Sequence, residues 1–187
     1  NCWFAGSVTG TKEIGGIIGR INGGATITNC LNTGDVTSIS TEATPYVGGL
    51  FGRTDSSSTA TIKYCLNTKE VHYNTEKATS GYGTVLGGAY SSTTFNNTYT
   101  ITQANVGVVN NAAKSGVTQV GTESDITGAK ALTKMPNLFK YQNEEGKYIN
   151  YWAITSEGAP ILESFADIAD KTCMGIDLSW YDGKNNY

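Results

Sequence analysis

The sequence predicts an all-β fold: a right-handed parallel β-helix, or β-solenoid, of about three to four coils, with a small C-terminal cap containing one short helix and a strand pair. Three observations support this prediction. An eight-residue block recurs along the first half of the chain, and a Gly-Gly block recurs between its copies. The apolar stripe at 3.6-residue spacing that helical repeats need is absent. We expect the repeats over residues 1–120, the cap over 121–165, and a linker toward a following module over 166–187.

The first block has the pattern N-C-x-N-x-G-x-V. Its copies begin at Asn1, Asn29, Tyr64 and, in decayed form, Asn97. The cysteines of the first three copies are 28 and 35 residues apart. The unequal spacing falls in polar, turn-rich stretches such as 38–46 and 74–83, which we expect to be outward loops that accept insertions.

The second block has the pattern V-G-G-[IL]-x-G. Its copies are expected to begin at Ile14, Val47 and Leu86, with the glycine pairs Gly15 and Gly16, Gly48 and Gly49, and Gly87 and Gly88. Such a pair permits a tight bend or a close backbone approach where a Cβ would collide. Phosphate binding is the functional alternative, but no Lys-Ser or Lys-Thr follows and no helix is predicted to open there.

One repeat is interpreted as one coil of three short strands, near residues 15–18, 26–30 and 35–37 in the first repeat. Matching strands would stack about 4.8 Å apart, because a single coil cannot bury its inner face alone. An apolar residue also precedes each later copy of the first block, at Ile27, Ile62 and Phe95.

The composition excludes several classes of function. Charged residues make up 16% of 187 residues and the net charge is −3, so no nucleic-acid partner is expected. No apolar run approaches the roughly 20 residues that cross a bilayer, and we expect no membrane insertion. The first residues lack the charged and apolar regions of a signal peptide, so we expect any export signal to lie outside the chain.

The two blocks together resemble the GLUG motif, over residues 1–111. GLUG repeats occur in tandem in large secreted or wall-attached bacterial proteins, including adhesin-like chains and non-catalytic parts of secreted peptidases. The resemblance implies a location outside the cell, secreted or at the bacterial surface. It implies a non-catalytic structural or adhesion module, a stalk or display scaffold, whose partners are neighbouring modules of the same chain. The chain would be an internal piece of a much longer protein.

The C-terminal third is expected to cap the repeats. Asp125 is a candidate N-cap for a helix over 126–135 that Pro136 would stop, and its apolar face would cover the open end of the coils. Residues 148–154 and 159–162 predict two strands joined by a turn at 156–158. The segment 132–162, with Trp152 and a Gly-x-Pro-hydrophobic strand, resembles the closing part of GLUG modules, and 177–181 resembles the opening of a following module.

Two columns of repeated polar residues have structural and functional interpretations. Cys2, Cys30 and Cys65 are expected to pack as a core ladder; a disulfide is within reach of in-register Cα atoms, but parallel Cβ directions make its torsion awkward. Asn29, Asn32 and Asn67 are expected to form an amide ladder that satisfies turn backbone. Sugar contact is the weaker alternative, because no aromatic neighbour repeats with them.

A flat Thr-x-Thr ice-binding face is not expected. Thr26, Thr61 and Thr94 align, but the neighbouring column is Thr28, Lys63 and Asn96.

No enzyme is expected, and no metal or cofactor site. The four cysteines contain no CxxC pair, and His72, the only histidine, has no evident orienting partner beside Cys65. Asp35 and Asp55 lie in different blocks without repeated acidic or basic companions, so a polysaccharide-degrading β-helix enzyme is a distant alternative.

The main functional alternative is a module that binds a glycan or a host surface protein through aromatic residues in its loops. The candidate residues are Tyr46, Tyr73, Tyr82 and Tyr90. Aromatic faces can stack on sugars, whereas the structural interpretation is that these tyrosines pack the loops onto the coils.

Overall fold

Five short strands make up each passage of the chain through the repeat region, and we call such a set a pass. The computed structural model describes residues 1–89, 92–139, 141–142, 148–149 and 151–165. The first pass contains β1 (Cys2–Phe4), β2 (Ser7–Gly10), β3 (Ile14–Gly15), β4 (Ile18–Ile21) and β5 (Ala25–Thr28). The second contains β6 (Cys30–Asn32), β7 (Asp35–Ser38), β8 (Val47–Gly48), β9 (Phe51–Thr54) and β10 (Ala60–Lys63). The third contains β11 (Leu66–Asn67), β12 (Val71–His72), β13 (Tyr82–Gly83), β14 (Leu86–Gly88) and β15 (Thr94–Asn96).

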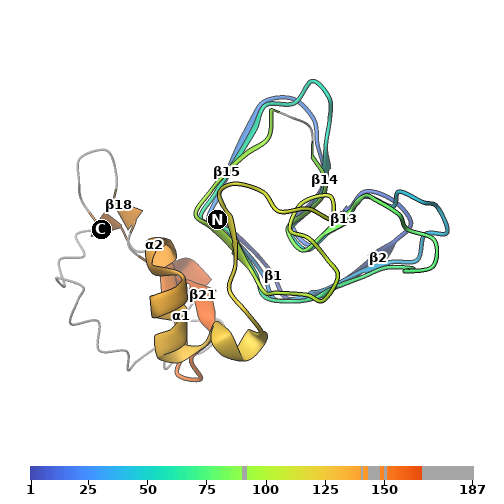
Figure 1. Cartoon of the computed structure of the whole chain (residues 1–187). Coiled ribbons are helices and arrows are strands. Elements are labelled where there is room, and N and C mark those ends of the chain that lie inside the picture. The colour runs from blue at the N-terminus through green and yellow to red at the C-terminus, as the bar shows by residue number, and fades with distance from the viewer. Residues whose placement is uncertain (90–91, 140, 143–147, 150, 166–187) are drawn as a thin grey trace.

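Strands of successive passes pair in parallel, so the expected all-β class and parallel pairing are confirmed. The largest sheet has the order β1-β6-β11-β16-β17, where β16 is Thr98–Thr100 and β17 is Val117–Gln119. Four further sheets contain three strands each, one from each pass. The passes lie over one another in Figure 1, in colours from blue to green.

The register confirms most of the columns expected from the repeats. Cys2 pairs with Cys30, and Leu31 pairs with Leu66. The columns that run through all three passes include Thr26, Thr61 and Thr94, then Ile27, Ile62 and Phe95, and then Thr28, Lys63 and Asn96. The loops between β7 and β8 and between β12 and β13 contain the stretches of unequal length.

The expectation of three strands per repeat is wrong, because two of the expected strands are each divided. Gly16 and Ile17 separate β3 from β4, so the segment 15–18 is a corner rather than one strand. Asn29 has a φ of 52°, in the left-handed region, and it separates β5 from β6. Tyr64 and Asn97 occupy the same corner in later passes, with φ values of 53° and 43°.

The expected alignment of the third Gly-Gly block is also wrong, by four residues. Tyr82 pairs with Val47 and Gly83 with Gly48, so the third copy begins at Tyr82 and not at Leu86. Gly87 and Gly88 instead continue β14, where Gly88 pairs with Arg53. The physical reason is that sheet register keeps the 35-residue offset that already separates Cys30 from Cys65.

The C-terminal elements are short. They are a 3₁₀ turn η1 (Glu123–Asp125), α1 (Gly128–Lys134), α2 (Pro136–Phe139), β18 (Tyr141–Gln142), β19 (Tyr148–Ile149), β20 (Trp152–Ile154), β21 (Pro160–Leu162) and a second turn η2 (Glu163–Phe165). The expected strand pair is confirmed in part. β20 and β21 pair antiparallel, but the expected strand 148–154 is not a single strand of this pair, because β19 pairs with β18 instead. The helix boundaries differ from the prediction: α1 starts after Thr127, and Pro136 begins α2 rather than ending the helical region.

Asp125 is not the N-cap of α1. It occupies the last position of η1, and its carboxylate accepts hydrogen bonds from the backbone N–H and the hydroxyl of Thr122, at 3.0 and 3.1 Å. This is a capping box on the preceding turn. Among the described residues, no helix has the length and apolarity needed to cross a bilayer.

The C-terminal elements cover the side of the largest sheet, not the end of the stacked passes, which corrects the expected position of the cap. Leu31, Leu66 and Tyr99 point outward from that sheet and form one buried cluster with residues of α1, α2, β20 and β21. Trp3 of the first pass contacts Phe165, with ring centroids 5.9 Å apart. Figure 1, in which the passes overlie one another, shows α1, α2 and β21 beside β1.

The end of the stack at the third pass is covered by residues 101–121. The side-chain amide of Gln103 accepts from the backbone N–H of Val71 and donates to the carbonyl of Val71, both at 2.8 Å, so it imitates a further strand. The backbone at Gly107 and Val108 accepts hydrogen bonds from residues 84–86, and β17 covers β16.

Candidate functional site

The repeated asparagines meet the repeated glycines at a narrow point inside the stacked passes. The Asn32 side-chain amide donates to Oδ1 of Asn67 at 2.8 Å, and both side chains are fully buried. Asn67 also donates to the backbone carbonyls of Thr84 at 2.8 Å and Lys69 at 2.6 Å. The expected amide ladder therefore exists at Asn32 and Asn67, where it satisfies backbone groups of the turns.

The glycines allow the ladder to lie this close to the opposite backbone. A Cβ on Gly16 would lie 2.9 Å from Oδ1 of Asn32, and one on Gly49 would lie 2.5 Å from Cγ of Asn67. The preceding glycines, Gly15 and Gly48, face backbone atoms of their own pass and of the next one. All four φ angles lie outside the left-handed region, so the glycines are needed here for close approach and not for a turn conformation.

Gly87 and Gly88 also face atoms at close range, but at the position that their own register gives them. A Cβ on Gly88 would lie 2.5 Å from the ring of Tyr46. These two glycines therefore make room for the Tyr46 ring and the adjoining backbone, not for the asparagine ladder.

Asn29 is outside the ladder, which corrects the expected set. Its side-chain oxygen accepts a hydrogen bond from Nε1 of Trp152 at 3.2 Å. This contact joins the β5–β6 corner to β20, 123 residues later, and gives the buried indole N–H an acceptor.

The expected core ladder of cysteines exists at Cys30 and Cys65, which are buried in a cluster with Phe51, Ile62 and Leu86. The expectation is wrong at Cys2, which is exposed in the first pass. Burial raises the pKa of the Cys65 thiol well above its usual range. All three are free thiols.

The predicted tyrosines do not form one surface. Tyr82 is 8% exposed, its ring stacks on Tyr73 at 4.3 Å between centroids, and its hydroxyl accepts from Asn111. The Tyr46 ring lies under the guanidinium of Arg53, 4.7 Å from the centroid. The stacking partners of these rings are therefore side chains of the same chain. Tyr90 and residues 166–187, including the expected linker, lie outside the described residues.

A cluster of ion pairs beside Tyr46 was missed by sequence reasoning. Asp55 accepts two hydrogen bonds from Nε of Arg20 at 3.0 Å and one from Nη2 of Arg20 at 2.6 Å, and it also pairs with Arg53 at 2.8 Å. Glu13 pairs with Arg53 at 3.2 Å. Hydrogen bonding from Arg20 is the main cause that lowers the pKa of Asp55. The signal was present as a repeated Gly-Arg pair, in which Arg20 and Arg53 are register partners.

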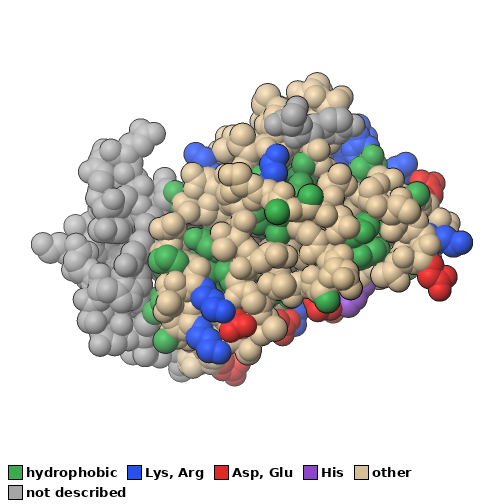
Figure 2. Space-filling view, in the orientation of Figure 1, with side chains coloured by type: hydrophobic (Ala, Val, Ile, Leu, Met, Phe, Trp, Pro, Cys, Tyr) green, Lys and Arg blue, Asp and Glu red, His purple; other side chains and the backbone are tan. Residues whose placement is uncertain are grey.

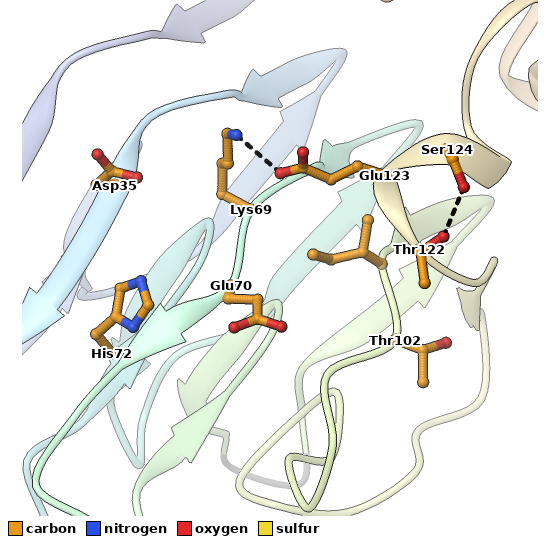
Figure 3. A pocket seen from close by; sticks show the side chains of 9 residues that line it. Asp35, Lys69, Glu70, His72, Thr102, Thr122, Glu123 and Ser124 are labelled. Carbon is orange, nitrogen blue, oxygen red and sulfur yellow. Dashed lines mark hydrogen bonds and ion pairs between the residues drawn. The ribbon is translucent and has the colours of Figure 1, made fainter.

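A polar cleft of about 570 Å³ is a candidate for binding a ligand (Figure 3). It lies between β12 and the segment that contains Thr102 and η1. Its walls are mostly exposed polar side chains; they include Asp35, Lys69, Glu70, His72, Thr102, Thr122, Glu123 and Ser124. Lys69 and Glu123 form an ion pair at 2.8 Å, and this pairing is the main cause that raises the pKa of Lys69.

The cleft does not bring together the groups considered for catalysis. His72 is exposed and lines the cleft, whereas Cys65 is fully buried among apolar side chains. Asp35 lines the cleft, whereas Asp55 is held by Arg20 and Arg53 in a different sheet. Within the described ranges, no three His, Cys, Asp or Glu side chains are grouped so that they could hold a metal ion.

On the face drawn in Figure 2, hydrophobic side chains are exposed in small, separate areas. Among the residues with described side chains, Ile39 is the one large apolar residue that is strongly exposed, at 62%. Comparison with family models, curated proteins and solved structures found no match to this chain.

Proposed function

We propose that this chain is a non-catalytic structural and adhesion module of a large bacterial cell-surface protein, built as a right-handed GLUG-type β-solenoid that acts as a stalk or display scaffold. The observation that carries the proposal is the use of the repeated residues. Asn32 and Asn67 contact each other and the paired glycines Gly16 and Gly49 between passes, Cys30 and Cys65 pack in the core, and none of these residues lines the cleft. The repeated residues therefore serve to stack one pass on the next.

Further support comes from the way the described polar groups are used. Arg20, Arg53, Glu13 and Asp55 neutralise one another, and Lys69 in the cleft is paired with Glu123. A module that carries other domains away from a surface needs rigid stacking and no catalytic groups. The location outside the cell follows from the resemblance to GLUG repeats and remains part of the proposal.

A distance measurement between two spin labels tests the stacking of the passes. Thr26→Cys and Thr94→Cys would be labelled together in a Cys2→Ser, Cys173→Ser background, in which Cys30 and Cys65 stay buried. These two threonines are two passes apart in one column, so their Cα atoms should be about 10 Å apart. Distance distributions centred above about 20 Å would overturn the stacking.

The second candidate function is binding of a glycan or host surface protein. The exposed polar cleft is a better candidate site for such a ligand than the tyrosines. Arrays of glycans and of extracellular-matrix proteins would be probed with the purified chain, with His72→Ala and Glu70→Ala as cleft variants. Lys77→Ala is the matched control, because Lys77 is exposed outside the cleft. A scaffold should show no saturable binding. Saturable binding that both cleft variants lose and the control keeps would replace the scaffold by a binding module.

A further inference from the structure

Two cysteines of adjacent passes are direct register partners, and one of them is accessible. Cys2 on β1 pairs with Cys30 on β6 in the parallel register. Cα atoms of such partners lie about 4.8 Å apart, inside the 4.4 to 6.8 Å that disulfides span. Cys2 is exposed and Cys30 is buried, while Cys65, the next member of the column, is fully buried.

The surroundings of Cys30 favour its reaction as a thiolate. Its sulfur lies between the Cys2 and Cys65 thiols, and a hydrogen bond from Cys65 is the main cause that lowers the pKa of Cys30 to about 7. Cys65 keeps its proton, because burial raises its own pKa. Thiolates are the reactive form of cysteine, so we expect Cys30 to react as a thiolate that the Cys65 thiol stabilises by hydrogen bonding.

Parallel Cβ directions oppose a disulfide between neighbouring strands in the middle of a sheet, but β1 is an edge strand. Among the described strands it pairs with β6 alone, and its residues are exposed or half-buried. The Cys2 backbone can therefore shift toward Cys30 at the cost of few contacts, whereas β6, which contains Cys30, and β11, which follows Cys65, each pair with strands on both sides.

We infer that Cys2 and Cys30 form an oxidisable pair, which closes to a disulfide in the presence of a small-molecule disulfide and ties the first pass to the second. The Cys2 thiolate attacks one sulfur of the oxidant, forms a mixed disulfide and releases one thiolate. The Cys30 thiolate then attacks the Cys2 sulfur, forms the Cys2–Cys30 bond and releases the second. Two protein thiols are oxidised, one small-molecule disulfide is reduced to two thiols, and the two protons leave with them.

The cross-link acts where the stack is weakest. Among the described strands, those of the first pass have partners on one side only, and apolar side chains of this pass such as Val8 and Ile18 are half-buried, whereas their register partners Val36 and Phe51 are fully buried. In stacked repeats each unit depends on its neighbours, so the first pass should open before the others.

The test uses the full chain with Cys173→Ser, reduced and then treated with oxidised glutathione. After blocking of free thiols, trypsin gives Cys2 in peptide 1–12, Cys30 in peptide 21–53 and Cys65 in peptide 64–69. The expected product is monomeric protein in which 1–12 is linked to 21–53 and Cys65 is unoxidised. A link between 21–53 and 64–69, or a product that stops at a glutathione adduct on Cys2, would overturn the assignment.

Two variants and one further measurement separate the steps. Cys30→Ser should accumulate the glutathione adduct on Cys2, because the resolving thiol is missing. Cys65→Ser should still cross-link, but more slowly; loss of the link in this variant would show that Cys65 takes part directly. Hydrogen exchange of residues 7–21 should slow at least tenfold in the oxidised protein, and unchanged exchange would refute the stabilisation of the first pass.

Discussion

The most informative single substitution is Asn67→Ala, at the centre of the amide ladder. The Asn67 side chain is fully buried, donates to the backbone carbonyls of Thr84 and Lys69, and accepts from the side chain of Asn32. Alanine would leave the Thr84 carbonyl and the Asn32 amide without this partner. Neither group can turn to water, because both are enclosed between the largest sheet and the glycine-rich corner.

The expected loss follows from these contacts. Leaving one buried polar group unsatisfied costs about 1 to 3 kcal/mol, and at least two groups are affected here. We therefore expect the free energy of unfolding to fall by about 3 to 5 kcal/mol, a large part of the roughly 5 to 15 kcal/mol typical of a domain. Guanidinium unfolding, followed by tryptophan fluorescence and by circular dichroism, measures this difference.

Asn96→Ala is the matched control, because it removes the same side chain from an exposed position on β15. It should change the free energy of unfolding by less than about 0.5 kcal/mol. A loss below about 1 kcal/mol for Asn67→Ala, or equal losses for the two variants, would refute the role of the ladder.

Three further outcomes are expected. Gly49→Ala should lower the free energy of unfolding by more than about 3 kcal/mol, because the new Cβ meets backbone and the Asn67 amide, whereas Gly24→Ala, with its nearest atom at 3.4 Å, should change it by about 0.5 kcal/mol or less. Hydrogen bonds from Thr122 lower the pKa of Asp125 to about 2, so its contribution is complete above the ordinary pKa and is lost as pH falls toward 2. The Tm deficit of Asp125→Asn should accordingly be clear at pH 6 and vanish near pH 2; a constant deficit would contradict this. Trp152→Ala should expose residues 121–165 to protease while residues 30–89 stay protected from hydrogen exchange, and equal loss of both would show that the two parts unfold together.

The repeat, the parallel pairing and the columns of cysteine, threonine and isoleucine could be predicted from the sequence. These features depend on identity between equivalent positions, which a single chain displays when its repeats are compared. The division of the expected strands was not visible, because Asn29, Tyr64 and Asn97 share a left-handed φ without sharing a side chain. A tyrosine in the sequence does not predict a residue with a left-handed φ, so the corner at Tyr64 could not be expected.

The position of the C-terminal elements could not be predicted, because it depends on contacts between distant residues. Helix periodicity indicates that α1 has an apolar face, but not which surface this face covers. The outward leucines of the largest sheet, Leu31 and Leu66, were the available clue: they stand between inward residues of the same block and are fully buried. An apolar residue on the outer face of an otherwise polar repeat indicates a covering element.

The ladder and the glycine corner change together at the third pass, and this coupling is itself testable. Gly16 faces Asn32 and Gly49 faces Asn67, but the register places Thr84 at the next glycine position and Thr100 at the next asparagine position. A shorter side chain in the ladder thus accompanies a larger one in the corner, at the cost of a buried Thr84 hydroxyl without a hydrogen-bond partner. Thr100→Asn alone should destabilise the chain by crowding Thr84, and Thr84→Gly alone should leave a void. The double variant should recover about 1 to 3 kcal/mol relative to the sum of the single changes, measured in a double-mutant cycle of unfolding free energies. Additive effects would mean that the corner and the ladder are filled independently, and that the Gly-Gly block is not there to admit the asparagines.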